Sequence, residues 1–336
     1  MADRTITDMG GRQVSVPGLG ALKKIYYTGA PAEIYCFTLA PELAGGTTFQ
    51  FTPQELAYLP ASAADLPYLG SLSGGQQLNP EEIVSAGIQL IVSAPFGAPT
   101  ASDVSDANDL QQQTGIPVVL ISGALNDSDA TYTFLGALLG KPDQAKLLAD
   151  YCDQALAAVD SAVAQVPDDQ KVTLYYAEGP DGLQTEPTNS SHAEAFITAG
   201  ANDVAVVADG SGVGMSAVSL EQVINWNPDV IIAWSADIRG GADDIIRTDS
   251  TWSSIQAVQD GRVYTMPNTP FAWCDRPPGV NRLLGIQWLA NMLYPTYYNV
   301  DMVQVTEQFY SLFYHVTLTD DQAKALLGNS YPAGSQ

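Results

Sequence analysis

The sequence is poor in basic residues. Thirteen lysines and arginines stand against 37 aspartates and glutamates, which gives a formal net charge of −24 over 336 residues. Nucleic acids and anionic membranes both bind basic surfaces, so this charge argues against either as a partner. No apolar run approaches the ~18 residues that a membrane-spanning helix requires.

Cysteine and histidine are also scarce, and this excludes several kinds of site. Cys36, Cys152 and Cys274 are isolated and odd in number, with no C-x-x-C pair. They therefore indicate neither a zinc site nor a redox motif, and we expect buried apolar side chains. Only His192 and His315 are available, so no Ser/His/Asp catalytic set can be assembled. Neither a Walker lysine motif nor a complete dinucleotide-binding glycine motif occurs, and we expect no cofactor.

The composition is that of a globular protein large enough for two cores. Hydrophobic residues make up 46% of the chain, and glycine and proline are present in ordinary amounts. A chain of this length exceeds one typical hydrophobic core.

One pattern of fifteen residues occurs twice. Residues 79–93 read NPEEIVSAGIQLIVS and residues 219–233 read SLEQVINWNPDVIIA. Asn79 and Ser219 are good N-cap residues, and each is followed three positions later by Glu or Gln, which predicts a capping box. Each short helix then leads through a polar break into an unbroken apolar strand of the kind found in parallel sheets.

Any helix–strand unit could produce this likeness by chance. We interpret it instead as two homologous lobes, each with its own parallel sheet. The remaining elements fit that division. In the first lobe we expect strands at 5–17, 23–29 and 116–122 and helices near 52–55 and 102–115. In the second lobe we expect strands at 171–179 and 261–268, helices near 191–200 and 279–294, and amphipathic helices in 300–328.

A long helical pattern separates the two sets of elements. Apolar residues recur at helical spacing over 141–166, with no glycine or proline after Pro142. An ordinary surface helix would show the same pattern. Its position between the repeats favours a connector, so we predict an N-terminal α/β lobe over 1–140, a connecting helix over 141–166 and a C-terminal α/β lobe over 167–336.

The order of these segments resembles a known family. GGRQVSVP near the start, the connecting helix, SLEQVINWNPDVIIA, WSSIQAVQDGRVYTMP and a late helix ending in Tyr-Pro together resemble cluster A, class III substrate-binding proteins of ABC importers. Members of that family carry ferric siderophores, haem, cobalamin and, in one branch, molybdate or tungstate. GPDGLQTEP and PFAWCDRPPGVNRLLGIQWLA look most like that branch.

The resemblance implies an α/β fold of two lobes joined by one long helix, with modest closure on binding. It implies no enzyme activity and a monomer that delivers a metal compound to an ABC permease dimer. It also implies export across the inner membrane, to the periplasm or to a lipid anchor on the outer face of the cytoplasmic membrane. The start, MADRTIT, has no signal region, so by itself it is also compatible with a cytoplasmic protein.

The candidate binding residues follow from the predicted parallel sheets. Ligands in such sheets lie outside the carboxyl ends of the strands. The residues that follow the strands of the first lobe are Tyr27, Thr28, Pro95 and Phe96. Those of the second lobe are Tyr176, Glu178, Trp234 and the loop TPFAWCDRPP, which contains Trp273 and Arg276.

Charge singles out two of the second-lobe residues. Ser191 and Glu194 predict a capping box that places His192 in the first helical turn, and Arg276 precedes the Pro-Pro expected to open the 279–294 helix. A cationic side chain at a helix N-terminus makes a local anion site. The alternatives are a solvated histidine and a plain salt bridge, and Trp273 could simply close the core.

The sequence leaves the ligand and one other function class open. One or two arginines, Arg276 and Arg239, favour a small oxyanion or a weakly charged chelate, whereas the many aromatic residues would suit a bulky ligand. An enzyme that uses Glu178 and Asp275 as acid and base on a similar fold is the alternative.

The repeat also predicts a docking surface. Glu81 and Glu221 occupy the same position in the two capped helices, where acidic residues also favour the helix dipole. The resemblance implies more, because members of the family commonly place one glutamate on each lobe to meet arginines of a two-fold symmetric permease. Glu81 and Glu221 are the predicted pair, with Glu82 as the substitute for Glu81.

Overall fold

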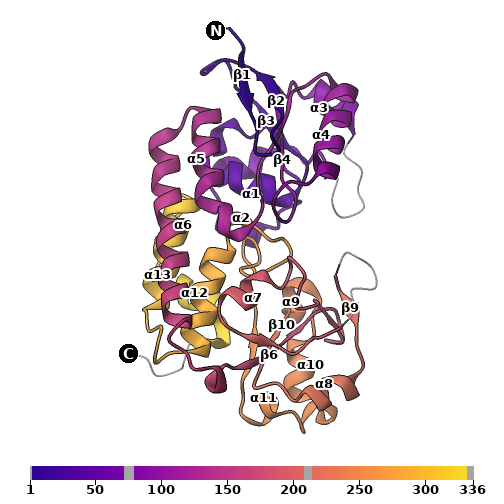
Figure 1. Cartoon of the computed structure of the whole chain (residues 1–336), viewed down its shortest axis with the longest axis vertical. Helices are drawn as coiled ribbons and strands as arrows, with labels where there is room; N and C mark the ends of the chain where they lie inside the picture. The colour runs from indigo at the N-terminus through magenta and orange to yellow at the C-terminus, as the bar shows by residue number, and fades with distance from the viewer. Residues whose placement is uncertain (1, 72–78, 208–213, 331–336) are drawn as a thin grey trace. The chain divides into compact units, whose positions relative to one another are not determined.

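The structure is a computed structural model, and it describes residues 2–71, 79–207 and 214–330. The chain forms two compact units. The first consists of residues 1–154 with the short segments 277–280 and 309–317, and the second consists of 155–276, 281–308 and 318–336. The predicted α/β class with parallel sheets is confirmed (Figure 1).

The first unit is built around a three-stranded parallel sheet in the order β3-β4-β5. An antiparallel pair, β1 and β2, precedes it. The elements of this unit are β1 (Arg4–Thr7), β2 (Gln13–Val16), β3 (Ile25–Tyr27), α1 (Ala30–Leu39), α2 (Pro53–Leu56), α3 (Pro80–Ser85), β4 (Leu90–Ser93), α4 (Ala101–Thr114), β5 (Val118–Leu120) and α5 (Ser128–Leu139).

Helices bury this sheet on both faces, as its unbroken apolar strands predict. Every residue of β3 and β5 is buried. α1 packs against α5, and α3 lies beside α4 (Figure 1). Tyr132, Tyr151 and Phe313 add ring contacts to this core at centroid distances of 5.3–5.9 Å. His315 lies in the same region and its Nε2 contacts the carbonyl oxygen of Thr38 at 3.0 Å.

The second unit contains a four-stranded parallel sheet in the order β11-β10-β6-β8 and a small antiparallel pair, β7 and β9. Its strands are β6 (Thr173–Ala177), β7 (Gln184–Thr185), β8 (Asn202–Asp203), β9 (Ser216–Ala217), β10 (Val230–Ala233) and β11 (Val263–Thr265). Its shorter helices are α7 (Glu194–Thr198), α8 (Leu220–Trp226), α9 (Ala236–Arg239), α10 (Asp243–Thr248) and α11 (Gln256–Gln259). The later helices are α12 (Arg282–Leu293), α13 (Met302–Phe313) and α14 (Asp320–Leu327).

The core of this unit lies under the repeated helix–strand segment. Ile231 of β10 and Val223 of α8 are both fully buried and pack with Trp252 and Ile255 in one apolar cluster. At the edge of the sheet the side chain of Asn329 hydrogen-bonds to the backbone of β11. It accepts a hydrogen bond from the Thr265 N–H and donates one to the Val263 carbonyl. This contact satisfies backbone groups that an edge strand would otherwise leave unpaired.

The two copies of the repeat have equivalent places in their sheets. α3 precedes β4, which lies between β3 and β5. α8 precedes β10, which lies between β6 and β11. The Ser219–Gln222 capping box forms as predicted, whereas Asn79 instead caps the N–H of Glu81 at 3.0 Å. The repeat is therefore one architectural unit used twice.

Two predicted helix starts are wrong. α7 begins at Glu194 without a side-chain cap, so the predicted Ser191–Glu194 capping box does not form. The hydroxyl of Ser190 accepts the N–H of His192 instead. α12 begins at Arg282 rather than at residue 279, and residues 277–280 belong to the first unit. Neither His192 nor Arg276 lies in the first turn of a helix.

A helix, α6 (Pro142–Val163), lies where the connecting helix was predicted, and its role as a connector stays a prediction. The division between the units falls within it, after Gln154. The lobe boundaries at residues 140 and 166 stay a prediction.

Candidate functional site

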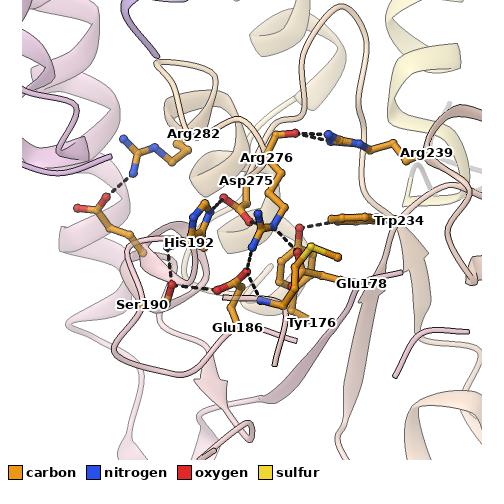
Figure 2. Close-up of polar contacts among 12 residues, drawn as sticks. Tyr176, Glu178, Glu186, Ser190, His192, Trp234, Arg239, Asp275, Arg276 and Arg282 are labelled. Carbon is orange, nitrogen blue, oxygen red and sulfur yellow. Dashed lines mark hydrogen bonds and ion pairs between the residues drawn. The ribbon is translucent and has the colours of Figure 1, made fainter. Parts of the chain in front are cut away.

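A group of buried polar residues lies at the carboxyl ends of the parallel strands in the second unit (Figure 2). Tyr176 and Glu178 stand at the end of β6, and Trp234 directly follows β10. The indole Nε1 of Trp234 donates a hydrogen bond to the Tyr176 hydroxyl at 2.7 Å. Parallel strands bring their carboxyl ends to one edge, which is why residues distant in sequence meet here.

Arg276 is at the centre of this group. Its Nε donates to Glu178 Oε1 at 2.7 Å, and its Nη2 donates to Glu186 Oε1. Both carboxylates are buried, at 0% and 1% exposure. Burial alone would lower the pKa of the guanidinium, but the neighbouring carboxylates of Glu178 and Asp275 raise it above its ordinary value. Arg276 therefore stays charged, and the two carboxylates fix the plane of its guanidinium group.

Acidic groups outnumber this arginine. Burial raises the pKa of Glu178 to about 9, although Arg276 opposes the shift, and Glu186 and Asp275 reinforce it. Oε2 of Glu178 and Oδ2 of Asp275 are buried and accept no hydrogen bond from the residues that the structure describes. Such groups are costly to bury without partners.

His192 faces the same acidic group. Its Nδ1 lies 2.5 Å from Asp275 Oδ1, and only 7% of its side chain is exposed. Oδ2 of Asp275 lies 3.6 Å from Arg276 Nε. The sequence predicted a role for His192 and Arg276 together, and the structure brings both to one aspartate.

The sequence did not single out Glu186, which the structure places among these residues. Its Oε1 also accepts the N–H of Met215 at 3.0 Å, and its Oε2 accepts the Ser190 hydroxyl at 3.0 Å. A Cβ on Gly214 would lie 2.1 Å from Glu186 Oε2, so only glycine fits there. Glu186 follows β7, a two-residue strand that pairs with β9 far along the chain. Its position in GLQTEP carried no local signal for that pairing.

Arg239 supports the backbone that carries Arg276. Its guanidinium donates from Nη2 to the Arg276 carbonyl oxygen at 2.5 Å and lies 5.0 Å above the Trp234 ring. Arg276 itself has a φ of 49°, in the left-handed region that few residues other than glycine adopt. A residue held in that conformation at a polar cluster is a sign of a functional position.

Trp273 packs inside the second unit. It is fully buried, and its ring meets that of Trp288 edge to face at 6.4 Å. This is the core position that the sequence left open as an alternative. Its contact with a ligand stays a prediction.

The predicted residues of the first unit lie at the carboxyl ends of β3 and β4. Tyr27 is fully buried, and its hydroxyl accepts or donates no hydrogen bond among the described residues. Thr28 donates to the Ser93 hydroxyl at 3.0 Å, and Phe96 is 37% exposed. Their roles as ligand contacts stay predictions.

Glu81 and Glu221 are both exposed. Each stands in the first turn of a helix capped by the residue predicted for it, Asn79 or Ser219. Their surroundings are thus alike in the two units.

Comparison with known proteins decides the family. A family model described as periplasmic binding protein matches residues 37–270. The chain belongs to this family. This confirms the resemblance seen in the sequence. Across the described residues, no helix of this binding protein is both long and apolar enough to cross a bilayer.

Two relatives extend the comparison. An ABC transporter solute-binding protein from Sulfurospirillum deleyianum has a TM-score of 0.87 and 28% identity, covering 96% of this chain and 98% of that one. The molybdate-binding protein MolA of Haemophilus influenzae is 35% identical over 114 residues, which are 33% of this chain and 31% of MolA. The structure of MolA bound to molybdate has a TM-score of 0.72 and 24% identity, covering 94% and 99% of the two chains.

Proposed function

We propose that this periplasmic binding protein captures a metal compound and delivers it to an ABC permease. The family match and the full-length likeness to a solute-binding protein of an ABC transporter support this proposal. Both relatives described above are named as binding proteins, which argues against the alternative of an enzyme with Glu178 and Asp275 as acid and base.

The observation that carries the proposal is the placement of Arg276. Two buried carboxylates hold its guanidinium at the carboxyl edge of the second sheet, which is where ligands of parallel sheets bind. About a fifth of its side chain is exposed, whereas its two partners are buried. A fixed guanidinium suits the planar or tetrahedral oxygen groups of an anion. Arg276 and His192 are the proposed contacts of an anionic group on the ligand.

The proposed ligand is a metal oxyanion of the molybdate and tungstate type or an anionic iron chelate. The local likeness to MolA favours the oxyanion. Tyr27, Thr28, Phe96, Tyr176, Glu178, Trp234 and Trp273 complete the proposed set of ligand contacts. A bulky chelate would use more of these aromatic side chains than a small oxyanion would.

The proposed partner is a permease dimer, and the proposed docking residues are Glu81 and Glu221. A protein with two similar units can offer a two-fold symmetric partner one matching contact from each. We propose that the mature protein works as a monomer outside the cytoplasmic membrane, in the periplasm or on a lipid anchor.

Calorimetric titration tests the proposed function. The purified protein is titrated with molybdate, tungstate, a ferric hydroxamate siderophore, haem and cobalamin, with sulfate as the control oxyanion. We expect one of the five metal compounds to bind at one site and to raise the melting temperature in proportion to its affinity. Mass spectrometry should recover that compound unchanged. A chemically altered compound would indicate an enzyme, and no binding by any of the five would contradict the proposal.

A further inference from the structure

The buried group around Arg276 also contains a set of metal-ligand atoms. Glu186, His192 and Asp275 each offer one such atom, and these atoms all lie within 4.8 Å of one another. All three residues are buried. They come from separate segments of the second unit: the residue after β7, the turn before α7 and the loop after β11. Figure 2 shows the three side chains pointing toward one another.

A second observation is that two carboxylate oxygens of this group have no hydrogen-bond partner in the described part of the chain. Oδ2 of Asp275 and Oε2 of Glu178 are buried and have no hydrogen-bond partner among the described residues. Both side chains are 0% exposed. Arg276 forms ion pairs with the carboxylates of Glu178, Glu186 and Asp275, and the His192 ring lies against Asp275. Buried carboxylates are stable only when they are paired, protonated or bound to a metal, and the nearest charged group to Oδ2 of Asp275 in these ion pairs is Arg276 Nε, at 3.6 Å.

We propose that Glu186, His192 and Asp275 bind a divalent transition-metal ion of the Zn²⁺ type within the second unit. This inference does not rest on the importer function, and it would hold if no oxyanion or chelate bound.

The chemistry of the donor atoms selects this class of ion. One imidazole nitrogen and two carboxylate oxygens, without a thiolate, suit Zn²⁺ and its neighbours Co²⁺ and Ni²⁺ better than the harder Mg²⁺ or Ca²⁺. Three protein ligands leave a further coordination position for water or a ligand.

Neighbouring groups already hold one of the proposed metal ligands, Glu186, in place by hydrogen bonds. The Ser190 hydroxyl and the Met215 N–H hold the two oxygens of Glu186. Groups of this kind orient the ligands of a metal site. Ligand atoms around a tetrahedral ion with bonds of about 2.0–2.2 Å lie about 3.3–3.6 Å apart, so His192 and Asp275 must separate by about 1 Å to admit the ion. The side chain of Arg276, which is 20% exposed, marks the route to solvent.

The charge of Arg276 should have opposite effects on the binding of a cation and of an anion. The guanidinium of Arg276 bonds Glu186 Oε1, one of the two oxygens that this carboxylate can offer the ion, and its positive charge repels the ion. Removing this charge should therefore strengthen cation binding, whereas it should weaken binding of an anion at the same place. The Arg276→Gln variant thus separates this site from the proposed anion site.

The experiment uses the full chain after dialysis against a chelator. Zn²⁺ and Co²⁺ chlorides are titrated into the wild type and into His192→Gln, Asp275→Asn and Arg276→Gln. The controls are His315→Gln, which removes the other histidine, and Asp168→Asn, whose carboxylate is fully at the surface. Binding is followed by calorimetry and by the visible absorption of bound Co²⁺.

We expect one high-affinity ion per chain and Co²⁺ absorption in the range typical of a mixed nitrogen and oxygen site. His192→Gln and Asp275→Asn should weaken Zn²⁺ binding at least about tenfold, Arg276→Gln should strengthen it about tenfold, and both controls should bind as the wild type does. Full retention of Zn²⁺ affinity in His192→Gln would overturn the inference. So would weak binding of many ions that salt abolishes, which is what a chain of net charge −24 shows without a site.

A measurement on the wild type covers the case in which Asp275→Asn fails to fold. Cobalt broadens the proton resonances of a nearby imidazole, and His315→Gln assigns the two histidines. We expect one equivalent of Co²⁺ to broaden the resonances of His192 and to spare those of His315. Equal effects on both histidines would contradict a site at His192.

Discussion

Gly87 and Asn227 occupy the same position in the two copies of the repeated segment, and both have left-handed backbone. Their φ angles are 72° and 45°. Each lies at the end of its helix, where the chain turns into β4 or β10. A left-handed residue is a common way to end a helix, and glycine and asparagine adopt it most readily. The two units thus share a turn as well as a strand order.

This relationship predicts an order of stability for variants of Gly87. Among the described residues, no heavy atom beyond Gly87 and its two chain neighbours lies within 4 Å of a Cβ built there, so the backbone angle decides the effect of a substitution. Gly87→Ala should lower the free energy of unfolding by roughly 1 kcal/mol, and Gly87→Asn should lower it by less. Denaturant unfolding measures both. Equal losses would show that the shared turn is not the reason for the two residues.

Glu33 should make stability depend on pH. The residue is buried in α1, and burial raises its pKa from 4.5 to about 7, although hydrogen bonds from Thr48 oppose the shift. The folded protein therefore holds this proton more tightly than the unfolded chain does. As the pH rises from 4.5 to 7, the unfolded chain loses the proton first, and the free energy of unfolding falls.

Glu33→Gln removes this dependence while keeping an acceptor for Thr48. Between pH 4.5 and 7.5 the variant should gain roughly 3 kcal/mol of stability relative to the wild type. Unfolding in denaturant at the two pH values measures the difference. Glu82→Gln, an exposed carboxylate, is the control and should track the wild type. A constant difference between Glu33→Gln and the wild type would mean that Glu33 is ionised throughout.

Gly214 should be required for the polar group of the second unit. A methyl group at this position would meet the Glu186 carboxylate, and φ is 73°. Gly214→Ala should displace Glu186, release one bond of Arg276 and weaken ligand binding several-fold. Gly240→Ala is the matched control, because Gly240 has a φ of 61° but open space around a Cβ. If both variants bind ligand equally well, Glu186 does not position Arg276.

The capping boxes show how far local sequence determines this fold. Ser219 with Gln222 forms the predicted capping box, and Thr52 with Glu55 forms another, whereas Asn79 caps its helix through Glu81 without the box predicted with Glu82. Ser191 does not act as a cap: α7 begins at Glu194 without one, and the neighbouring Ser190 accepts the N–H of His192 and donates to Glu186.

Some residues of the candidate site could likewise be predicted from local sequence, and others could not. Tyr176, Glu178 and Trp234 could be predicted because each lies at the end of an apolar strand or directly after it. Glu186 could not, because its position depends on the pairing of β7 with β9 and on contacts with Met215 and Arg276. The clustering of acids around Arg276 is a property of the folded chain that no single segment contains.

Glu81 and Glu221 should act together in permease docking. The double variant Glu81→Ala/Glu221→Ala should keep ligand affinity and lose stimulation of permease ATPase in vesicles, because a symmetric partner needs both contacts. Asp168→Ala serves as the control for loss of surface charge. Full stimulation by the double variant would mean that the repeated helix is architecture alone, and loss in Glu82→Ala but not Glu81→Ala would move the contact by one residue.

The proposed capture of a metal compound is tested most directly by titrating the wild type and Arg276→Gln with molybdate. Arg262→Gln, which removes an arginine away from the polar group, is the control. We expect one site in the wild type and in the control, and affinity at least about tenfold lower in Arg276→Gln, as for the loss of a charge-assisted hydrogen bond. Equal molybdate affinity in all three proteins would contradict the account.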